Sequence, residues 1–173
     1  ELIRQLNMIT LYRLLVLGCF SIILNSCGFS LRGNDVLSSK FQVIQLDMEQ
    51  PNSEFSRLLR RSLEVADVTI EAELSTNSDS PVLLVRNERI VSRPITVNPR
   101  ARAAQYEMRL SINIALGSAE EYLIFPETLM VERIYFEDIA NIAGTQEEVE
   151  IITAEMRREL VNQLMRRLEA IET

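Results

Sequence analysis

The sequence of 173 residues contains no histidine, no tryptophan, five glycines and a single lysine among its 18 basic residues. Because histidine is the commonest general base and metal ligand, its absence excludes Ser-His-Asp and Cys-His catalysis and a histidine-based zinc site. Five scattered glycines leave no Gly-rich phosphate loop. The net charge of −7 argues against general nucleic-acid binding, which needs a basic surface.

Catalysis by paired carboxylates is also disfavoured. The acidic pairs Glu120-Glu121 and Glu147-Glu148 fall in an expected turn and at an expected helix start. They are interpreted as solvated surface charge. The sequence therefore predicts a protein that is not an enzyme and that has no catalytic residues, metal or cofactor.

An uncharged apolar run covers residues 14–24 and follows Arg13, a pattern typical of an export signal peptide. It is shorter than the roughly 20 residues of a membrane-spanning helix, and a buried core helix is the alternative. The run ends in Leu24-Asn25-Ser26-Cys27, which resembles the bacterial lipobox, where cleavage occurs directly before an acylated cysteine. Met8 is the start that we expect for such a compact signal.

The two cysteines agree with a lipoprotein. Cys19 would be discarded with the signal peptide, and Cys27 would become the lipidated N-terminus. Several acyl chains would anchor the chain stably in a membrane, and Gly28 after the cysteine implies delivery to the outer membrane. We therefore expect a signal peptide at 1–26, a lipidated tether at 27–40 and a single domain at 41–173.

The mature chain has a mixed pattern of strands and helices. Strand patterns occur at 41–48, 68–74, 82–97, 107–116 and 123–137. Pro94 within 82–97 suits an edge strand or a bend. A helix is predicted after Pro51-Asn52-Ser53, because its apolar residues recur every three or four positions. The order predicts an α/β (α+β) sandwich with two helices packed on one face of a mixed, roughly four-stranded sheet.

The second helix is long and lies at the C-terminus. Thr145 and Glu148 suggest a capping box at its start. Its apolar stripe consists of Val149, Ile152, Met156, Leu160, Leu164, Leu168 and Ile171. Such a stripe is long enough to cover a sheet face.

One segment is locally basic. Between Val82 and Arg109, six arginines stand against two glutamates. The arginines are Arg86, Arg89, Arg93, Arg100, Arg102 and Arg109. Arginine pairs well with phosphate, so the segment could recognise a phosphorylated amphiphile. The alternative is an arginine-rich strand edge that resists edge pairing and forms ion pairs with acidic helices.

A second candidate surface follows the last strand. Tyr135 and Phe136 end an apolar strand, and Ile139, Ala140, Ile142 and Ala143 follow before the helix. If exposed, these residues would form a partner-binding patch; core packing is the alternative.

Four short motifs resemble a known family in their order. They are Cys27-Gly28-Phe29-Ser30-Leu31-Arg32, Ala104-Gln105-Tyr106-Glu107-Met108, VERIYFED at 131–138 and Glu155-Met156. In this order, and behind a lipobox, they resemble the lipopolysaccharide-assembly lipoproteins of the LptE (RlpB) family.

The resemblance implies a non-enzymatic outer-membrane lipoprotein. It would plug the LptD β-barrel translocon one to one, help to assemble that barrel, and bind lipopolysaccharide during its insertion into the outer leaflet. Cationic residues in the loop before the Tyr106 strand would bind the lipid, which here are Arg100 and Arg102. The alternative is an auxiliary lipoprotein of another envelope transport or secretion complex that binds no lipid.

Overall fold

The computed structural model describes residues 35–71, 80–97, 103–118, 121–137 and 141–171. All of them belong to the second of two units of the chain, residues 34–173. The helices there are α2 (Asp35–Lys40), α3 (Glu54–Val65) and α4 (Ile142–Glu169), and the strands are β1 (Val43–Met48), β2 (Thr69–Glu71), β3 (Val82–Val97), β4 (Ala103–Gly117) and β5 (Tyr122–Phe136). No helix in these ranges is both long and apolar enough to cross a membrane.

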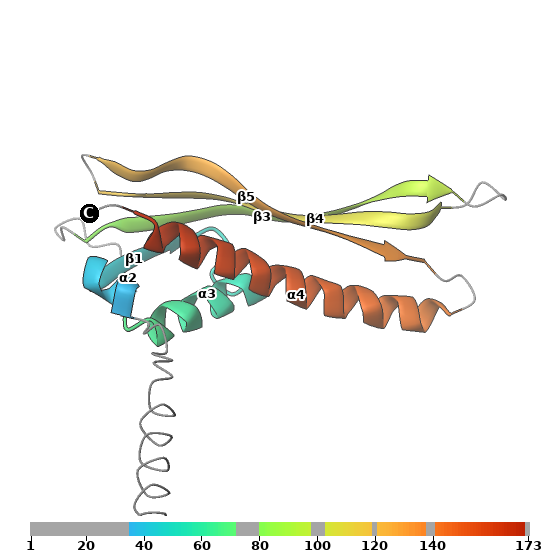
Figure 1. Ribbon diagram of the computed structural model, residues 1–173, viewed down its shortest axis with the longest axis horizontal. Helices are drawn as coiled ribbons and strands as arrows, with labels where there is room; N and C mark the ends of the chain where they lie inside the picture. The colour runs from blue at the N-terminus through green and yellow to red at the C-terminus, as the bar shows by residue number, and fades with distance from the viewer. Residues whose placement is uncertain (1–34, 72–79, 98–102, 119–120, 138–140, 172–173) are drawn as a thin grey trace, which may run out of the picture. The chain divides into compact units, whose positions relative to one another are not determined.

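The strands form one mixed sheet in the order β2-β1-β3-β4-β5. β1 pairs in parallel with β2 and β3, whereas β3, β4 and β5 form an antiparallel meander. The helices lie on one side of the sheet, with α3 and α4 side by side (Figure 1). The predicted α+β sandwich is confirmed. The sheet has five strands rather than about four, because the short β2 joins its edge.

The β1-α3-β2 unit forms as its sequence predicts. Ser53 caps α3, its hydroxyl oxygen accepting the backbone N–H of Ser56 at 3.1 Å. Phe55, Leu59 and Leu63 recur on one helix face and are fully buried. This face packs into the core under the sheet, where each such side chain contributes about 1.5–3 kcal/mol.

Alternation along β4 defines the two faces of the sheet. Its even-numbered residues from Met108 to Leu116 are buried against the helices, and Arg109 and Ser111 point the other way. β1 accompanies β3 only from Val82 to Val85. β3 is an inner strand rather than the edge strand that was one expectation for Pro94, but at Pro94 it is bonded among the described residues on the β4 side alone. A residue without an N–H is therefore tolerated there, and the register shift that follows it agrees with the expected bend.

The apolar stripe of α4 is confirmed, but its predicted start is wrong. Met156, Leu160, Leu164 and Leu168 are buried against the sheet. The helix begins three residues before Thr145. Asn141 is its N-cap and accepts the backbone N–H of Gly144 at 3.1 Å. Thr145 and Glu148 therefore do not form a capping box.

Helix α2 occupies part of the range expected to be a tether. Leu37 is buried in the core cluster. Lys40 Nζ donates to the backbone carbonyl oxygens of Glu169 and Ile171 at the end of α4. The end of the expected tether range is therefore helical and contacts the domain through Leu37 and Lys40, and the bounds of the tether stay a prediction. Cys27 and the expected signal peptide lie outside the described residues.

Candidate ligand-binding and partner-binding surfaces

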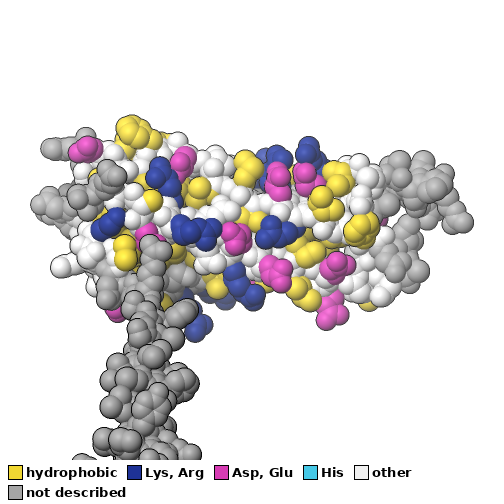
Figure 2. All heavy atoms as spheres, viewed as in Figure 1, with side chains coloured by type: hydrophobic (Ala, Val, Ile, Leu, Met, Phe, Trp, Pro, Cys, Tyr) yellow, Lys and Arg dark blue, Asp and Glu magenta, His cyan; other side chains and the backbone are white. Residues whose placement is uncertain are grey.

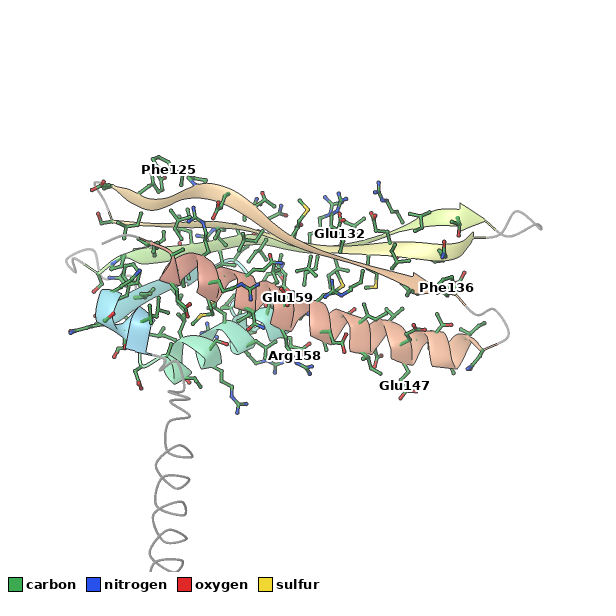
Figure 3. The ribbon with its side chains drawn as sticks, viewed as in Figure 1. Phe125, Glu132, Phe136, Glu147, Arg158 and Glu159 are labelled. Atoms are coloured by element: carbon green, nitrogen blue, oxygen red, sulfur yellow. The ribbon has the colours of Figure 1, made fainter. Side chains whose placement is uncertain are left out.

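The sheet face opposite the helices carries charged and apolar side chains, and none of the described helices lies over it. Phe125 and Glu132 project from this face, whereas Glu147 and Arg158 lie on the part of α4 that faces away from the sheet (Figure 3). Basic and acidic side chains adjoin one another along the upper rim in Figure 2. We call the outward side chains of β3, β4 and β5 the open face.

A ladder of ion pairs crosses the open face. The strand register places Arg93 opposite Glu107, and Arg109 opposite Glu132. Arg93 Nε donates to Glu107 Oε2 at 2.6 Å, and Arg109 Nε donates to Glu132 Oε1 at 2.6 Å. Arg109 Nη2 also lies 3.7 Å from Glu107 Oε2, which links the two pairs.

This ladder shifts the ionisation of its members. The hydrogen bond from Arg93 lowers the pKa of the Glu107 carboxyl below its ordinary value, and the charges of Arg93 and Arg109 add to the effect. The same hydrogen bond raises the pKa of Arg93. The pair is therefore ionised across the neutral pH range.

A shallow groove of about 300 Å³ lies along this ladder. It is lined by Arg89, Val91, Arg93, Glu107, Arg109 and Ser111. Arg89 is exposed, and among the described residues it has no acidic partner. The groove thus gathers three guanidinium groups and one carboxylate.

The other arginine of this segment within the described residues has a structural role. Arg86 on β3 pairs with Asp47 on β1 at 2.5 Å and donates to the backbone oxygen of Asp47 at 2.7 Å. The acidic partners of Arg86, Arg93 and Arg109 all come from strands. The expectation that the segment pairs with acidic helices is therefore wrong for these three residues.

Tyr135 and Phe136, which the sequence predicts to form a partner-binding patch if both are exposed, point to opposite faces of β5. Tyr135 lies on the helix side and stacks on Tyr106, with ring centroids 5.3 Å apart and an interplanar angle of 13°. Phe136 is 63% exposed. Successive strand residues alternate in direction, so Phe136 presents its ring to solvent on the open face and Tyr135 is half-buried on the helix side.

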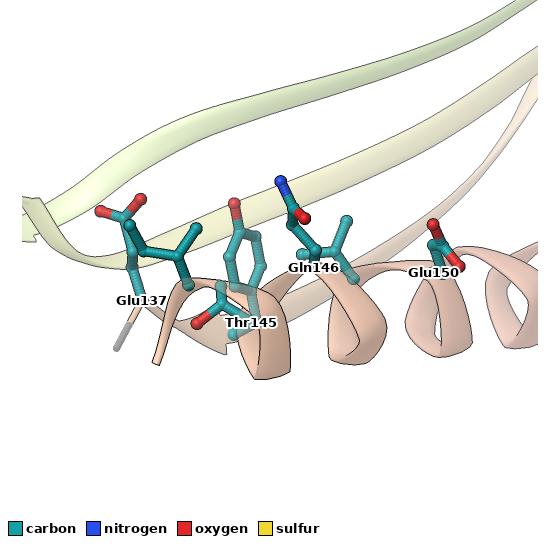
Figure 4. Close-up of a pocket in the computed structure, with 7 residues that line it drawn as sticks. Glu137, Thr145, Gln146 and Glu150 are labelled. Carbon is teal, nitrogen blue, oxygen red and sulfur yellow. The ribbon is translucent and has the colours of Figure 1, made fainter. Parts of the chain in front are cut away.

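Tyr135 instead lines a cleft between the end of β5 and the start of α4 (Figure 4). The cleft has a volume of about 520 Å³ and is lined by Tyr135, Glu137, Ile142, Thr145, Gln146, Val149 and Glu150. Tyr106 donates from its hydroxyl to Glu137 at 3.2 Å. Partial burial, followed by this hydrogen bond, raises the pKa of Tyr106.

Three predicted site residues fall outside the described ranges. Cys27, the expected acylation site, precedes α2. Arg100 and Arg102 lie in the connection between β3 and β4, whose flanking residues Val97 and Ala103 pair with each other.

One charged cluster was missed by the sequence analysis. Arg157 on α4 donates to Glu54 at the start of α3 at 2.7 Å, and its Nε lies 3.5 Å from Glu88 in β3. The Glu88 side chain is only 10% exposed. A β-bulge turns it inward, next to Asn87 with a φ of 57°. No periodic pattern marks these three residues, because each comes from a different element.

These features define an α+β domain with helices on one side of a mixed sheet and an open, charged face on the other. The chain belongs to the LptE family, described as lipopolysaccharide-assembly, whose family model matches residues 41–168. The resemblance stated from the motifs is thereby confirmed, and it places the chain among the lipoproteins of lipopolysaccharide assembly.

Individual relatives agree with the family. The chain is 29% identical over 154 residues to the LPS-assembly lipoprotein LptE of Pectobacterium atrosepticum, covering 89% of this chain and 83% of the relative. It is 27% identical over 154 residues to that of Photorhabdus laumondii, with the same coverage.

Solved structures share the fold. The crystal structure of rare lipoprotein B from Shewanella oneidensis aligns with a TM-score of 0.64 at 21% identity, covering 73% of this chain and 92% of that one. The solution structure of lipoprotein B from Nitrosomonas europaea aligns with a TM-score of 0.66 at 14% identity, covering 75% and 83%.

Proposed function

We propose that this chain is a non-enzymatic outer-membrane lipoprotein that plugs and helps to assemble an LptD-type β-barrel, one to one, and binds lipopolysaccharide during its insertion into the outer leaflet. The observation that carries the proposal is the family match over residues 41–168, which spans the sheet and nearly all of α4. The absence of histidine from the sequence agrees with a role in binding rather than catalysis.

Acylation of Cys27 would hold the domain at the membrane. The lipobox-like Leu24-Asn25-Ser26-Cys27 supports this site, as do relatives named lipoproteins. Intact mass spectrometry of the mature chain should show an N-terminal Cys27 with added acyl mass. Cys27→Ala should leave the chain unprocessed and unacylated. An unmodified Cys27 in the wild-type chain would contradict the anchor.

Lipopolysaccharide binding is assigned to Arg100 and Arg102. Within the same segment, Arg86 is engaged by the carboxylate and the backbone oxygen of Asp47. Charge-assisted hydrogen bonds from guanidinium to phosphate are short and strong, and reversing the charge removes them. Arg100→Glu with Arg102→Glu should therefore weaken lipopolysaccharide binding, with an unchanged circular dichroism spectrum.

The matched control for that variant lies on α3. Arg57→Glu with Arg61→Glu makes the same change in net charge at two exposed helix positions. It should bind lipopolysaccharide as the wild type does. Equal affinity of the wild type and the Arg100/Arg102 variant would overturn the assigned site, and a wild-type chain that binds no lipopolysaccharide would overturn the lipid-binding function.

Contact with a barrel is supported by exposed apolar residues at both ends of β5. Phe125 is 73% exposed and Phe136 is 63% exposed (Figure 3). A photo-crosslinking amino acid at either position should capture the barrel in cells. The same probe at Arg61 on α3 gives the comparison for general surface contact. If neither position captures the barrel, the result would count against contact between β5 and the barrel.

A further inference from the structure

We propose that the groove on the open face, formed by Arg89, Arg93 and Arg109, is a second anion site that binds the phosphate group of a phosphorylated amphiphile. This site is defined by described residues only, whereas Arg100 and Arg102 lie outside the described ranges. It rests on the proposed function only for the identity of its biological ligand, since its chemistry follows from the groove itself.

The charge of the groove favours an anion. Three guanidinium groups line it against the single carboxylate of Glu107. Including Glu132, which pairs with Arg109, the cluster keeps one net positive charge. The chain as a whole has a formal net charge of −7, so the groove is a locally positive site on a negatively charged protein. Its positive charge attracts an anion.

The two carboxylates orient the guanidinium groups as well as neutralising part of their charge. Glu107 accepts from Nε of Arg93, and Glu132 accepts from Nε of Arg109. Glu132 also contacts Nη2 of Arg109. A guanidinium has five N–H donors, so these contacts leave donors on the other terminal nitrogens for a second acceptor. Held on one side in this way, each arginine loses less side-chain freedom when an anion binds.

Arg89 supplies the third guanidinium group, which has no acidic partner among the described residues. It pairs in register with Ser111, whose hydroxyl also lines the groove. A phosphate between these residues would accept from a guanidinium on one strand and from a hydroxyl on the next. The lack of an acidic partner among the described residues makes Arg89 the most available donor in the groove.

Apolar side chains beside the groove favour a phosphate carried by a lipid over free phosphate. Val91 is part of the lining and is 40% exposed. On β5, Met130 lies opposite Ser111 and Ile134 lies opposite Glu107, and these two residues are 47% and 57% exposed. The acyl chains of a lipid would bury this apolar surface, whereas free phosphate would leave it exposed to water.

The test uses the full acylated chain in detergent micelles and isothermal titration calorimetry with three soluble probes. Dihexanoylphosphatidic acid carries a phosphate monoester on short acyl chains, and inorganic phosphate carries the anion alone. Dihexanoylphosphatidylcholine masks the phosphate with choline. We expect the phosphatidic acid to bind more tightly than either of the others. Inorganic phosphate binding as tightly as the phosphatidic acid would overturn the assignment to an amphiphile.

Variants then locate the binding. Arg89→Gln breaks no ion pair within the described residues and should weaken phosphatidic acid binding about fivefold, the loss of one charge-assisted contact. Arg89→Gln with Arg93→Gln should weaken it by more than about tenfold. The control Arg57→Gln with Arg61→Gln carries the same charge change on α3. Unchanged binding in Arg89→Gln and in the double variant, or equal weakening in the control, would overturn the groove.

Lipopolysaccharide binding by the same variants separates this inference from the proposed function. If the wild type binds lipopolysaccharide but the groove variants bind phosphatidic acid as tightly as the wild type does, the groove is wrong and the proposed function stands. If phosphatidic acid binding depends on Arg89 but the wild type binds no lipopolysaccharide, the groove stands and the proposed ligand is wrong.

Discussion

Lys40 at the end of α2 donates from Nζ to two backbone oxygens at the end of α4, those of Glu169 at 2.6 Å and Ile171 at 2.5 Å. The last carbonyl groups of a helix lack partners within the helix, and they carry the negative end of its dipole. The single lysine of the chain therefore joins its first described helix to its last.

Lys40→Met should destabilise the domain by about 1–2 kcal/mol, because methionine keeps most of the apolar stem and loses both charge-assisted bonds. Urea unfolding followed by circular dichroism measures the loss. Arg61→Met on the exposed side of α3 is the control and should change stability by no more than about 0.5 kcal/mol. A Lys40 variant as stable as this control would show that the bonds contribute little.

Arg157→Met should also destabilise the domain, by about 2 kcal/mol, because Glu88 would keep its charge in a nearly closed site without a cation. Pairing this change with Glu88→Gln removes the unpaired charge. The double variant should then be more stable than the sum of the two single losses predicts, as measured by a double-mutant cycle in urea. Strict additivity would mean that the two side chains do not interact.

The elements were predictable from the sequence to the extent that they repeat a local pattern. Alternation from Met108 to Leu116 gave β4, and the three-to-four spacing after Ser53 gave α3. Helix α2 was missed because six residues carry too few turns for a periodic signal, and it is held instead by the burial of Leu37 and the bonds of Lys40.

The charged ladder could not be predicted, because it depends on strand register. Arg93 meets Glu107 only through the pairing of β3 with β4, which includes shifts near Asn87 and Pro94. Tyr135 and Phe136 show a related limit. Their apolar character was plain in the sequence, but which of them faces the helices depends on the same register.

The start of α4 distinguishes the N-cap seen in the structure, Asn141, from the capping box that the sequence predicts at Thr145 and Glu148. Asn141→Ala should destabilise the domain by about 1 kcal/mol, because the N–H of Gly144 loses its acceptor. Glu148→Ala should change stability by no more than about 0.5 kcal/mol, since Glu148 lies within the helix and caps nothing. Thermal and urea unfolding of the two variants distinguish the alternatives. A larger loss in Glu148→Ala would restore the capping box at Thr145.

The Arg93–Glu107 pair should make stability depend on pH. Its hydrogen bond lowers the pKa of Glu107 in the folded state below the ordinary value of about 4.5. The unfolded chain therefore binds the proton more readily, and the contribution of Glu107 is fully present above pH 4.5 and is lost as the pH falls through the lower, folded value.

Glu107→Gln removes this dependence. The wild type should be more stable than the variant at pH 7, and the difference should shrink as the pH falls below the ordinary glutamate range. Urea unfolding at a series of pH values from neutral to acidic gives the comparison. A stability difference that stays constant across the series would show that Glu107 does not carry the effect.

Co-purification from outer membranes tests the proposed function most directly. The acylated chain, tagged at its C-terminus and extracted in mild detergent, should bring down a single large β-barrel in a one-to-one ratio. The barrel should change its mobility on heating in gel electrophoresis, and lipopolysaccharide should accompany the complex. Recovery of the chain alone, or with a complex of the inner membrane, would contradict a role as the plug of a lipopolysaccharide translocon.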